Sequence, residues 1–222
     1  MVLDKRTRYL QIAFNYDRAL VRRVLPSIPY SDRILIEAGT PFIKREGEDG
    51  IREIARLWRG VVVADLKVAD GAEGEVAMAR QAGARAATVL GNSPVETLDM
   101  FVEQCERAGV ASMIDMIGVN DPLKVVTQMR VPPEVIVLHR GRDEEGTRGK
   151  VIQYRHVNRV RSKYDVLISA AGGVDLKEAR SAIFNGASIV VVNLVEPGDP
   201  WQGISTREDV AGIARTFLET IE

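Results

Sequence analysis

The sequence has a single cysteine, few aromatic residues and almost no net charge. Cys105 is the only cysteine, so the chain cannot form an internal disulfide, which is typical of proteins in the reducing cytoplasm. Phe, Trp and Tyr together make up 5% of the chain, and the formal net charge is −1. A near-neutral chain lacks the basic excess that attracts nucleic acids or anionic membranes, so neither kind of partner is expected.

Long apolar runs are also missing. No stretch approaches the roughly 18 apolar residues that indicate a membrane-spanning helix, and residues 1–6 contain no apolar segment typical of a signal peptide. The 222 residues are 45% hydrophobic and 27% charged, an ordinary composition for a globular protein. Because no linker or low-complexity segment divides the chain, we expect one soluble, cytoplasmic domain over residues 1–222.

Short runs rich in β-branched residues recur along the chain and alternate with segments of helical periodicity, such as 94–108 and 176–185. The expected strands are residues 9–14, 33–37, 61–65, 85–90, 111–115, 134–138, 165–170 and 188–192. Gly83, Gly109 and Gly186 each follow a helical segment, where a left-handed residue commonly ends a helix. Eight strands alternating with helices favour a (β/α)₈ TIM barrel of the α/β class. An open doubly wound sheet is the alternative, but no Gly-x-Gly-x-x-Gly follows the first strand.

Three charged residues lie where a buried strand ends. Asp65, Lys67 and Asp70 follow the apolar run 60–64, and Asp65 and Lys67 share a face if the strand continues. Unpaired charges are costly to bury, so this group indicates a functional site. A salt bridge at a surface loop is the alternative explanation.

In a (β/α)₈ barrel, catalytic groups lie at the carboxyl ends of the strands. Nearly every expected strand here is followed by a polar residue or a glycine. In chain order these are Asn15, Glu37, Asp65 with Lys67, 91–93, Asp115, His139 with Arg142, Gly172 with Gly173, and Asn193. We therefore expect these side chains to gather at one mouth of the barrel.

Glu37 and Asp65 end neighbouring strands and offer hard carboxylate oxygens, which suit Mg²⁺. Lys67 beside them would supply a positive charge to stabilise an oxyanion or protonate an enediolate. Glu37 is alternatively a structural partner of Lys67 or Arg33. Asp115 is expected to support the Lys67 network rather than to react.

His139 follows a buried strand, where an imidazole is suited to move protons, although a buried structural histidine is the alternative. The other histidine, His156, lies in the arginine-rich segment 153–161 and is expected at the surface. Gly172 and Gly173 precede a helix, so their backbone amides could bind a phosphate. A plain tight turn explains two glycines equally well.

With these residues in place, the chain resembles the orotidine 5′-monophosphate decarboxylase suprafamily, whose members share Asp-x-Lys-x-x-Asp after the third strand. It is closer still to the 3-hexulose-6-phosphate synthase family. The similarity includes residues 36–44, 65–71, 88–91 and 114–122, and runs from about Leu10 to Pro200.

This resemblance implies a Mg²⁺-dependent aldol reaction, in which ribulose 5-phosphate forms an enediolate that adds formaldehyde, or the reverse. It implies that Glu37 and Asp65 bind metal, that Lys67 stabilises the enediolate and that His139 moves protons. It also implies that Asp70 reaches a neighbour's site, and hence a homodimer with shared active sites.

Three positions differ from the synthase pattern. Asn15 replaces an aspartate, and Val192-Asn193-Leu194 replaces a glycine-containing phosphate loop. The spacing from His139 to Arg142 is closer to that of 3-keto-L-gulonate 6-phosphate decarboxylases. Such a decarboxylase, or a related enzyme acting on another sugar phosphate, is therefore the first alternative. A barrel that binds a phosphorylated ligand without turnover is the second.

Overall fold

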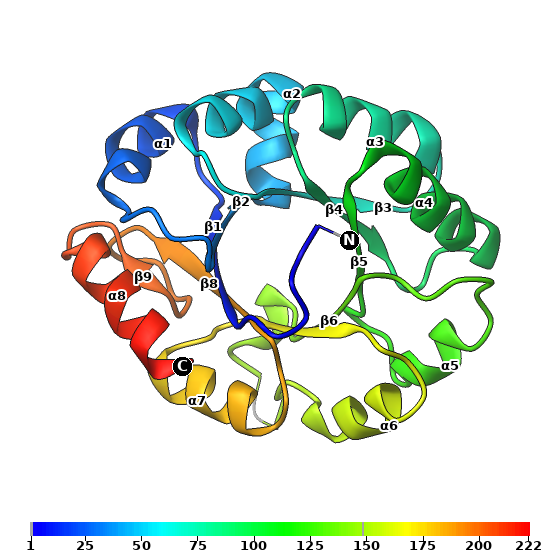
Figure 1. Ribbon diagram of the computed structural model, residues 1–222. Coiled ribbons are helices and arrows are strands. Elements are labelled where there is room, and N and C mark those ends of the chain that lie inside the picture. Colours follow the sequence, from blue (N-terminus) through cyan, green and yellow to red (C-terminus); the bar gives the residue numbers. More distant parts are fainter. Residues whose placement is uncertain (1, 148) are drawn as a thin grey trace.

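The structure is a computed structural model that describes residues 2–147 and 149–222, and its strands form a closed parallel barrel. Each strand pairs with the next, and β1 also pairs with β8, which closes the ring (Figure 1). The barrel strands are β1 (Tyr9–Phe14), β2 (Ile34–Ala38), β3 (Val62–Val68), β4 (Ala86–Leu90), β5 (Ala111–Asp115), β6 (Val135–His139), β7 (Leu167–Ala171) and β8 (Ile189–Val195). The expected (β/α)₈ barrel is confirmed, and the open sheet is excluded.

Helices follow the strands and form the outer layer (Figure 1). They are α1 (Arg18–Val24), α2 (Thr40–Leu57), α3 (Ala72–Gln81), α4 (Val95–Ala108), α5 (Pro122–Val126), α6 (Val157–Arg161), α7 (Leu176–Phe184) and α8 (Val210–Thr220). Short 3₁₀ turns occur at η1 (Leu25–Ser27), η2 (Arg142–Glu144) and η3 (Tyr154–His156). Gly83, Gly109 and Gly186 have φ of 101°, 65° and 92°, so the expected left-handed helix ends are present.

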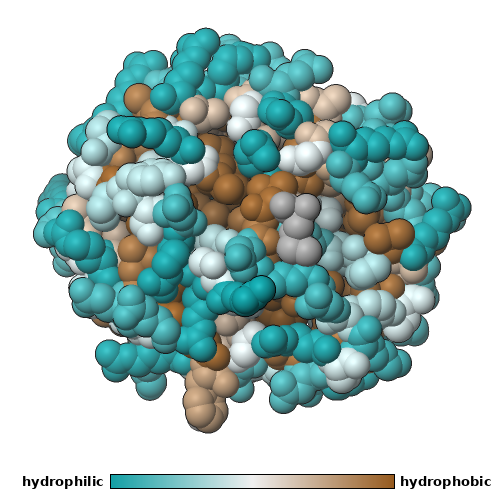
Figure 2. Space-filling model, viewed as in Figure 1, coloured by the Kyte–Doolittle hydropathy of each residue, from teal (hydrophilic) through white to brown (hydrophobic). Residues whose placement is uncertain are grey.

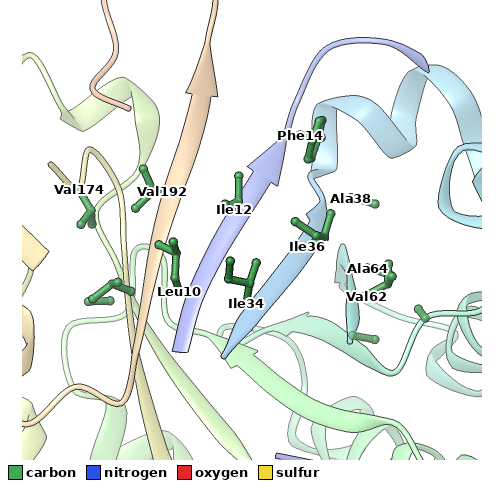
Figure 3. Close-up of a cluster of buried hydrophobic side chains, with 14 of the residues drawn as sticks. Leu10, Ile12, Phe14, Ile34, Ile36, Ala38, Val62, Ala64, Val174 and Val192 are labelled. Atoms are coloured by element: carbon green, nitrogen blue, oxygen red, sulfur yellow. The ribbon is translucent and has the colours of Figure 1, made fainter. Parts of the chain in front are cut away.

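The hydrophobic core has two layers because strand residues alternate between the faces of the sheet. One set of strand residues packs outward against the helices, and Figure 3 shows part of it, with Leu10, Ile12 and Phe14 of β1 beside Ile34 and Ile36 of β2. The other set fills the barrel interior. It includes Tyr9, Ala13, Leu35, Val63, Ala86, Ala111, Met113, Val135, Leu167 and Ile189.

The segment before β1 crosses one end of the barrel (Figure 1). Leu3 packs with the interior cluster, and the carboxylate of Glu134 accepts hydrogen bonds from the backbone amides of Val2 and Leu3. Figure 2 shows the same end, where hydrophobic residues lie near the centre and hydrophilic ones cover most of the periphery. None of the helices in the described part of the chain has the length and hydrophobicity to span a bilayer.

Three local expectations differ from the structure. β3 continues past Asp65 to Val68 through a register shift, and β8 continues through Asn193 to Val195, where it pairs with β9 (Ile204–Ser205). His156 was expected at the surface, and this is wrong: its side chain is buried at the start of α6, with 4% of its surface exposed. The arginines around it hid this burial in the sequence, because they point to solvent while the imidazole does not.

Candidate functional site

A cavity of about 320 Å³ opens at the carboxyl ends of the barrel strands. The side chains that line it continue the inward-facing rows that fill the barrel below. Those expected from the sequence are Asn15, Glu37, Asp65, Lys67, Asp115, His139, Arg142, Gly172 and Asn193. The predicted gathering of polar strand-end residues at one mouth is therefore present in the structure.

Lys67 stands at an irregular point of β3. It is the only non-glycine residue with positive φ (49°) in the described part of the chain, a backbone conformation that costs on the order of 1–3 kcal/mol. The register between β3 and β4 shifts between Ala64 and Val68, and the Lys67 amide donates to Thr88 Oγ1 at 2.9 Å. The bulge re-aims the Lys67 side chain into the cavity, so the strand alternation assumed from the sequence does not apply here.

The Lys67 ammonium lies between two carboxylates. Its Nζ is 3.0 Å from Asp65 Oδ2 and 2.5 Å from Asp115 Oδ2. Thr88 and Thr40 donate hydroxyl hydrogen bonds to Asp65, at 2.8 and 2.7 Å. Burial lowers the pKa of Lys67, but the charges of Asp65 and Asp115 outweigh burial and hold the pKa above its usual value. Lys67 is therefore a fixed positive charge in the cavity.

His139 at the end of β6 binds the same Asp115. Its Nδ1 lies 2.8 Å from Asp115 Oδ2. Burial lowers the pKa of His139, yet the charge and hydrogen bond of Asp115 raise it to a net value above the usual one. Burial would raise the pKa of Asp115, but His139 and Lys67 hold it well below its usual range. Asp115 thus orients both groups, which is the supporting position expected for it.

Glu37 of β2 is buried on the floor of the cavity, where Gln11 of β1 donates from Nε2 to Glu37 Oε2 at 2.5 Å. Burial, and after it the negative charge of Asp65, raises the pKa of Glu37 to about 7. A nearby cation would favour its ionised form. The amide oxygen of Gln11 is buried and has no hydrogen-bond partner among the described residues.

This donor set fits a hard divalent cation. Mg²⁺ commonly takes one or two protein carboxylates and completes its octahedron with water and substrate oxygens. Glu37 and Asp65 supply the carboxylates, and Gln11, which lines the same cavity, has an amide oxygen without a partner among the described residues. The described residues contain no cluster of three or more His, Cys, Asp or Glu side chains that could hold a metal, so substrate or water would have to complete the shell.

The rim of the cavity brings together residues distant in sequence. Asn15 Nδ2 donates to Asn193 Oδ1 at 3.0 Å across the β1–β8 junction. The Arg142 guanidinium lies 4.4 Å from the centre of the Trp201 ring, a cation–π contact between the segments that follow β6 and β8. Arg142 is therefore held at the opening rather than on the floor.

The backbone of the two glycines after β7 passes close to Arg140. Gly172 has φ of 102°, and a Cβ there would lie 1.9 Å from the carbonyl oxygen of Arg140, so only glycine fits. Gly172 lines the cavity, whereas Gly173 does not. The Arg140 guanidinium binds the Gly172 carbonyl oxygen at 2.9 Å, and a Cβ on Gly173 would lie 3.0 Å from Glu145 Oε2. A carboxylate thus lies beside the loop expected to bind phosphate.

Asp70 lies outside the cavity of its own chain: its side chain is exposed and accepts a hydrogen bond from the Gly71 amide at 2.8 Å. Gln11, Thr40, Thr88 and Glu145 line the cavity but were not identified from the sequence. Gln11 and Thr88 carried a signal, because a polar residue interrupts an apolar strand at each position.

The two histidines should titrate on opposite sides of the usual imidazole pKa of about 6.5. The pKa of His139 is raised, as described above. The pKa of His156 is lowered, mainly by burial and next by the charge of Arg155. In Asp115→Asn the pKa of His139 should fall below the usual value, because burial then acts without the carboxylate. NMR titration of the two imidazole signals checks this, and a His139 pKa unchanged in Asp115→Asn would contradict it.

The fold and site define a (β/α)₈ barrel whose mouth holds a lysine between two carboxylates, with a histidine on the second of them. The chain matches the family described as "Orotidine 5'-phosphate decarboxylase / HUMPS family" over residues 8–193. The chain belongs to this family.

Curated relatives include two proteins named "Bifunctional enzyme Fae/Hps". The one from Methanothrix thermoacetophila is 35% identical over 216 residues, which cover 96% of this chain and 53% of the relative. The one from Methanoculleus marisnigri is 36% identical over 221 residues, which cover 96% of this chain and 52% of the relative. The chain therefore spans about half the length of these relatives.

Solved structures agree with the fold. The 3-hexulose-6-phosphate synthase from Salmonella typhimurium superposes with a TM-score of 0.83 at 25% identity, covering 96% of this chain and 98% of that one. A structure of KGPDC from Streptococcus mutans superposes with a TM-score of 0.79 at 18% identity, covering 96% of this chain and 97% of that one. At that identity, the second comparison supports the fold alone.

Proposed function

We propose that this chain is a 3-hexulose-6-phosphate synthase-like aldehyde-lyase. It would join ribulose 5-phosphate and formaldehyde through an enediolate, or catalyse the reverse cleavage. The observation that carries the proposal is the Lys67 ammonium held between Asp65 and Asp115 in the cavity. The synthase structure and the Fae/Hps relatives support it.

Each of the site residues would have a separate role in the reaction. Removal of a proton from C1 of ribulose 5-phosphate leaves an enediolate, and the Lys67 ammonium would stabilise its developing negative charge. The enediolate carbon then attacks the formaldehyde carbon, forming the new C–C bond, and the resulting alkoxide takes a proton. His139, oriented by Asp115 at 2.8 Å, is placed to move these protons in its neutral and protonated forms.

Glu37 and Asp65 would hold Mg²⁺, which would supply Lewis-acid polarisation of substrate oxygens when bound. Asn15, Asn193 and the backbone of Gly172 would bind the sugar phosphate at the rim. Gly173, which was also expected to bind phosphate, lies outside the cavity lining and would support the turn beside it. The single, buried Cys105 fits a reducing compartment, so a cytoplasmic enzyme acting as one domain over residues 1–222 is part of the proposal.

A decarboxylase similar to the 3-keto-L-gulonate 6-phosphate enzymes is the second candidate. One observation favours it: Arg142, three residues after His139, lines the cavity and is held in place by Trp201. A guanidinium there could place a carboxylate or a water molecule. A barrel that binds a phosphorylated ligand without turnover is the third candidate.

Arg142→Ala should separate the two enzymatic candidates. Formaldehyde release from a hexulose 6-phosphate should persist in the variant, because none of the steps proposed for the aldol reaction uses Arg142. Both activities would be assayed with Mg²⁺ in wild type and variant, with Arg107→Ala, a surface arginine on α4, as the control. Two results together would favour the decarboxylase. Wild type would release carbon dioxide from 3-keto-L-gulonate 6-phosphate but no formaldehyde from a hexulose 6-phosphate, and Arg142→Ala would lose the carbon dioxide release.

We also propose a homodimer in which Asp70 enters the neighbouring site. Its exposure, and its position outside the cavity of its own chain, suit that role. Lys67→Ala and Asp70→Ala should each be inactive alone. Mixed by unfolding and refolding together, they should recover about a quarter of wild-type activity, because half of the dimers then hold one intact site. No recovery in a mixture shown to contain heterodimers would contradict shared sites.

A further inference from the structure

A second cavity, of about 220 Å³, adjoins the mouth, and His139 is the one residue of the described chain that lines both. Its walls are the loop after β5, the end of β6 and the segment that leads into α6. Both histidines of the chain, His139 and His156, line it. None of the roles proposed for the aldol reaction uses this space.

Positive charge dominates the lining. Arg140, Lys150 and Arg155 face one carboxylate among the described lining residues, that of Glu144. Glu144 Oε1 pairs with Lys150 Nζ at 2.7 Å, which leaves the two arginines without an acidic partner in the described lining. A cavity with surplus positive charge favours an anionic occupant.

Two buried N–H donors at this cavity lack acceptors. Arg140 Nε and His156 Nδ1 are both buried, and neither has a hydrogen-bond partner in the described part of the chain. Arg155 Nε donates to His156 Nε2 at 3.4 Å, which places the proton of a neutral imidazole on Nδ1. Buried polar groups normally find partners, so both donors are available to an acceptor. The Asp121 carboxylate, between the lining residues Asn120 and Pro122, acts on His156 through its charge but is paired with Arg159 at 3.1 Å.

We propose that this second cavity binds a phosphate group, as inorganic phosphate or as a small phosphate monoester, at a site separate from the sugar phosphate site. Several N–H donors and two arginines suit a tetrahedral dianion better than a planar carboxylate monoanion. Val119 and Leu138 also line the cavity and would accept the apolar part of an ester. An occupant would lie against His139, so its charge would act on the proton-moving group of the mouth.

Because the chain has two histidines, one NMR experiment can locate the anion. Sodium phosphate is titrated into the full chain at constant pH and ionic strength, and the two imidazole signals are followed. Binding in the second cavity should move the His156 signal, and the His139 signal should move with it. Binding in the mouth alone should move only the His139 signal, and that result would overturn the proposal.

Variants test the assignment of the cavity. Arg155→Gln and Lys150→Gln should each weaken the phosphate-dependent shift of His156 by about tenfold in dissociation constant. Lys163→Gln removes the same charge from an exposed position outside the cavity and should leave binding unchanged. Equal affinity in all four proteins would contradict the site.

Titrations with two different ligands distinguish a phosphate monoester from free phosphate. Tighter binding of glycerol 3-phosphate than of inorganic phosphate would indicate a monoester, and the reverse order would indicate the free ion. Acetate at the same concentration should not move the His156 signal. If acetate binds as tightly as phosphate, the proposed selectivity for a phosphate group is wrong.

Discussion

Replacing Lys67 with alanine is expected to lower kcat for formaldehyde release by a factor on the order of 10² to 10³. The ammonium is the one cation held against both Asp65 and Asp115, at 3.0 and 2.5 Å, among the described residues of the cavity floor. Without it, a developing oxyanion would face two carboxylates. Asp65→Asn should abolish activity as well, because Asp65 both holds Lys67 and is proposed to bind the metal.

Loss of Lys67 also leaves two largely buried carboxylates without their cation, and breaking such a pair typically costs about 3–5 kcal/mol. Thermal unfolding must therefore accompany the assay. Lys67→Arg provides the second variant: it keeps the charge and should keep the fold, yet lose rate, because a planar guanidinium does not reproduce the position of Nζ. Lys163→Ala, at the surface, should match wild type. Full activity in a folded Lys67→Ala would contradict the mechanism.

Replacing His139 with alanine is expected to lower the rate by roughly 10² to 10⁴, the usual contribution of a positioned acid–base group. In wild type, the rate of proton abstraction should rise with pH through the pKa of His139, because only the neutral imidazole accepts a proton. The midpoint of this rise in the pH–rate profile should lie above the usual imidazole pKa, since Asp115 raises the pKa of His139.

The pH profile separates a proton carrier from a structural residue. His139→Ala should lose this rise of the rate with pH altogether. Added imidazole should restore part of the rate by entering the space left by the side chain. Arg159→Ala, a surface change on α6, serves as the control. An unchanged pH profile in His139→Ala would assign the proton transfers to another group.

The barrel was predictable because its signals are local and repeated. Apolar strand runs such as 135–138 are bounded by polar residues, here Glu134 and His139, and parallel barrels require buried strands of this kind. The inward position of Glu37, Asp115 and His139 followed from their places at strand ends. The location of Asp65 beside Lys67 was also correct, although the pairing depends on the bulge at Lys67 rather than on simple alternation.

Contacts between distant segments were not predictable. Nothing local to Gln11 shows that its amide meets Glu37, or that Thr40 at the start of α2 reaches Asp65. The burial of His156 depends on how the segment after β6 folds against the β5 loop. The position of Glu145 beside Gly173 has the same origin. A pattern in one segment carries no information on such packing.

A crystal structure with Mg²⁺ and ribulose 5-phosphate is the most direct test of the proposed chemistry. The account predicts Mg²⁺ on Glu37 and Asp65, and the enediol-forming oxygens of the sugar within hydrogen-bond distance of Lys67 Nζ. His139 should lie beside C1, and the phosphate should lie at the rim near Gly172 and Asn193. A sugar bound with its phosphate against Lys67, or no sugar in the mouth at saturating concentration, would contradict it.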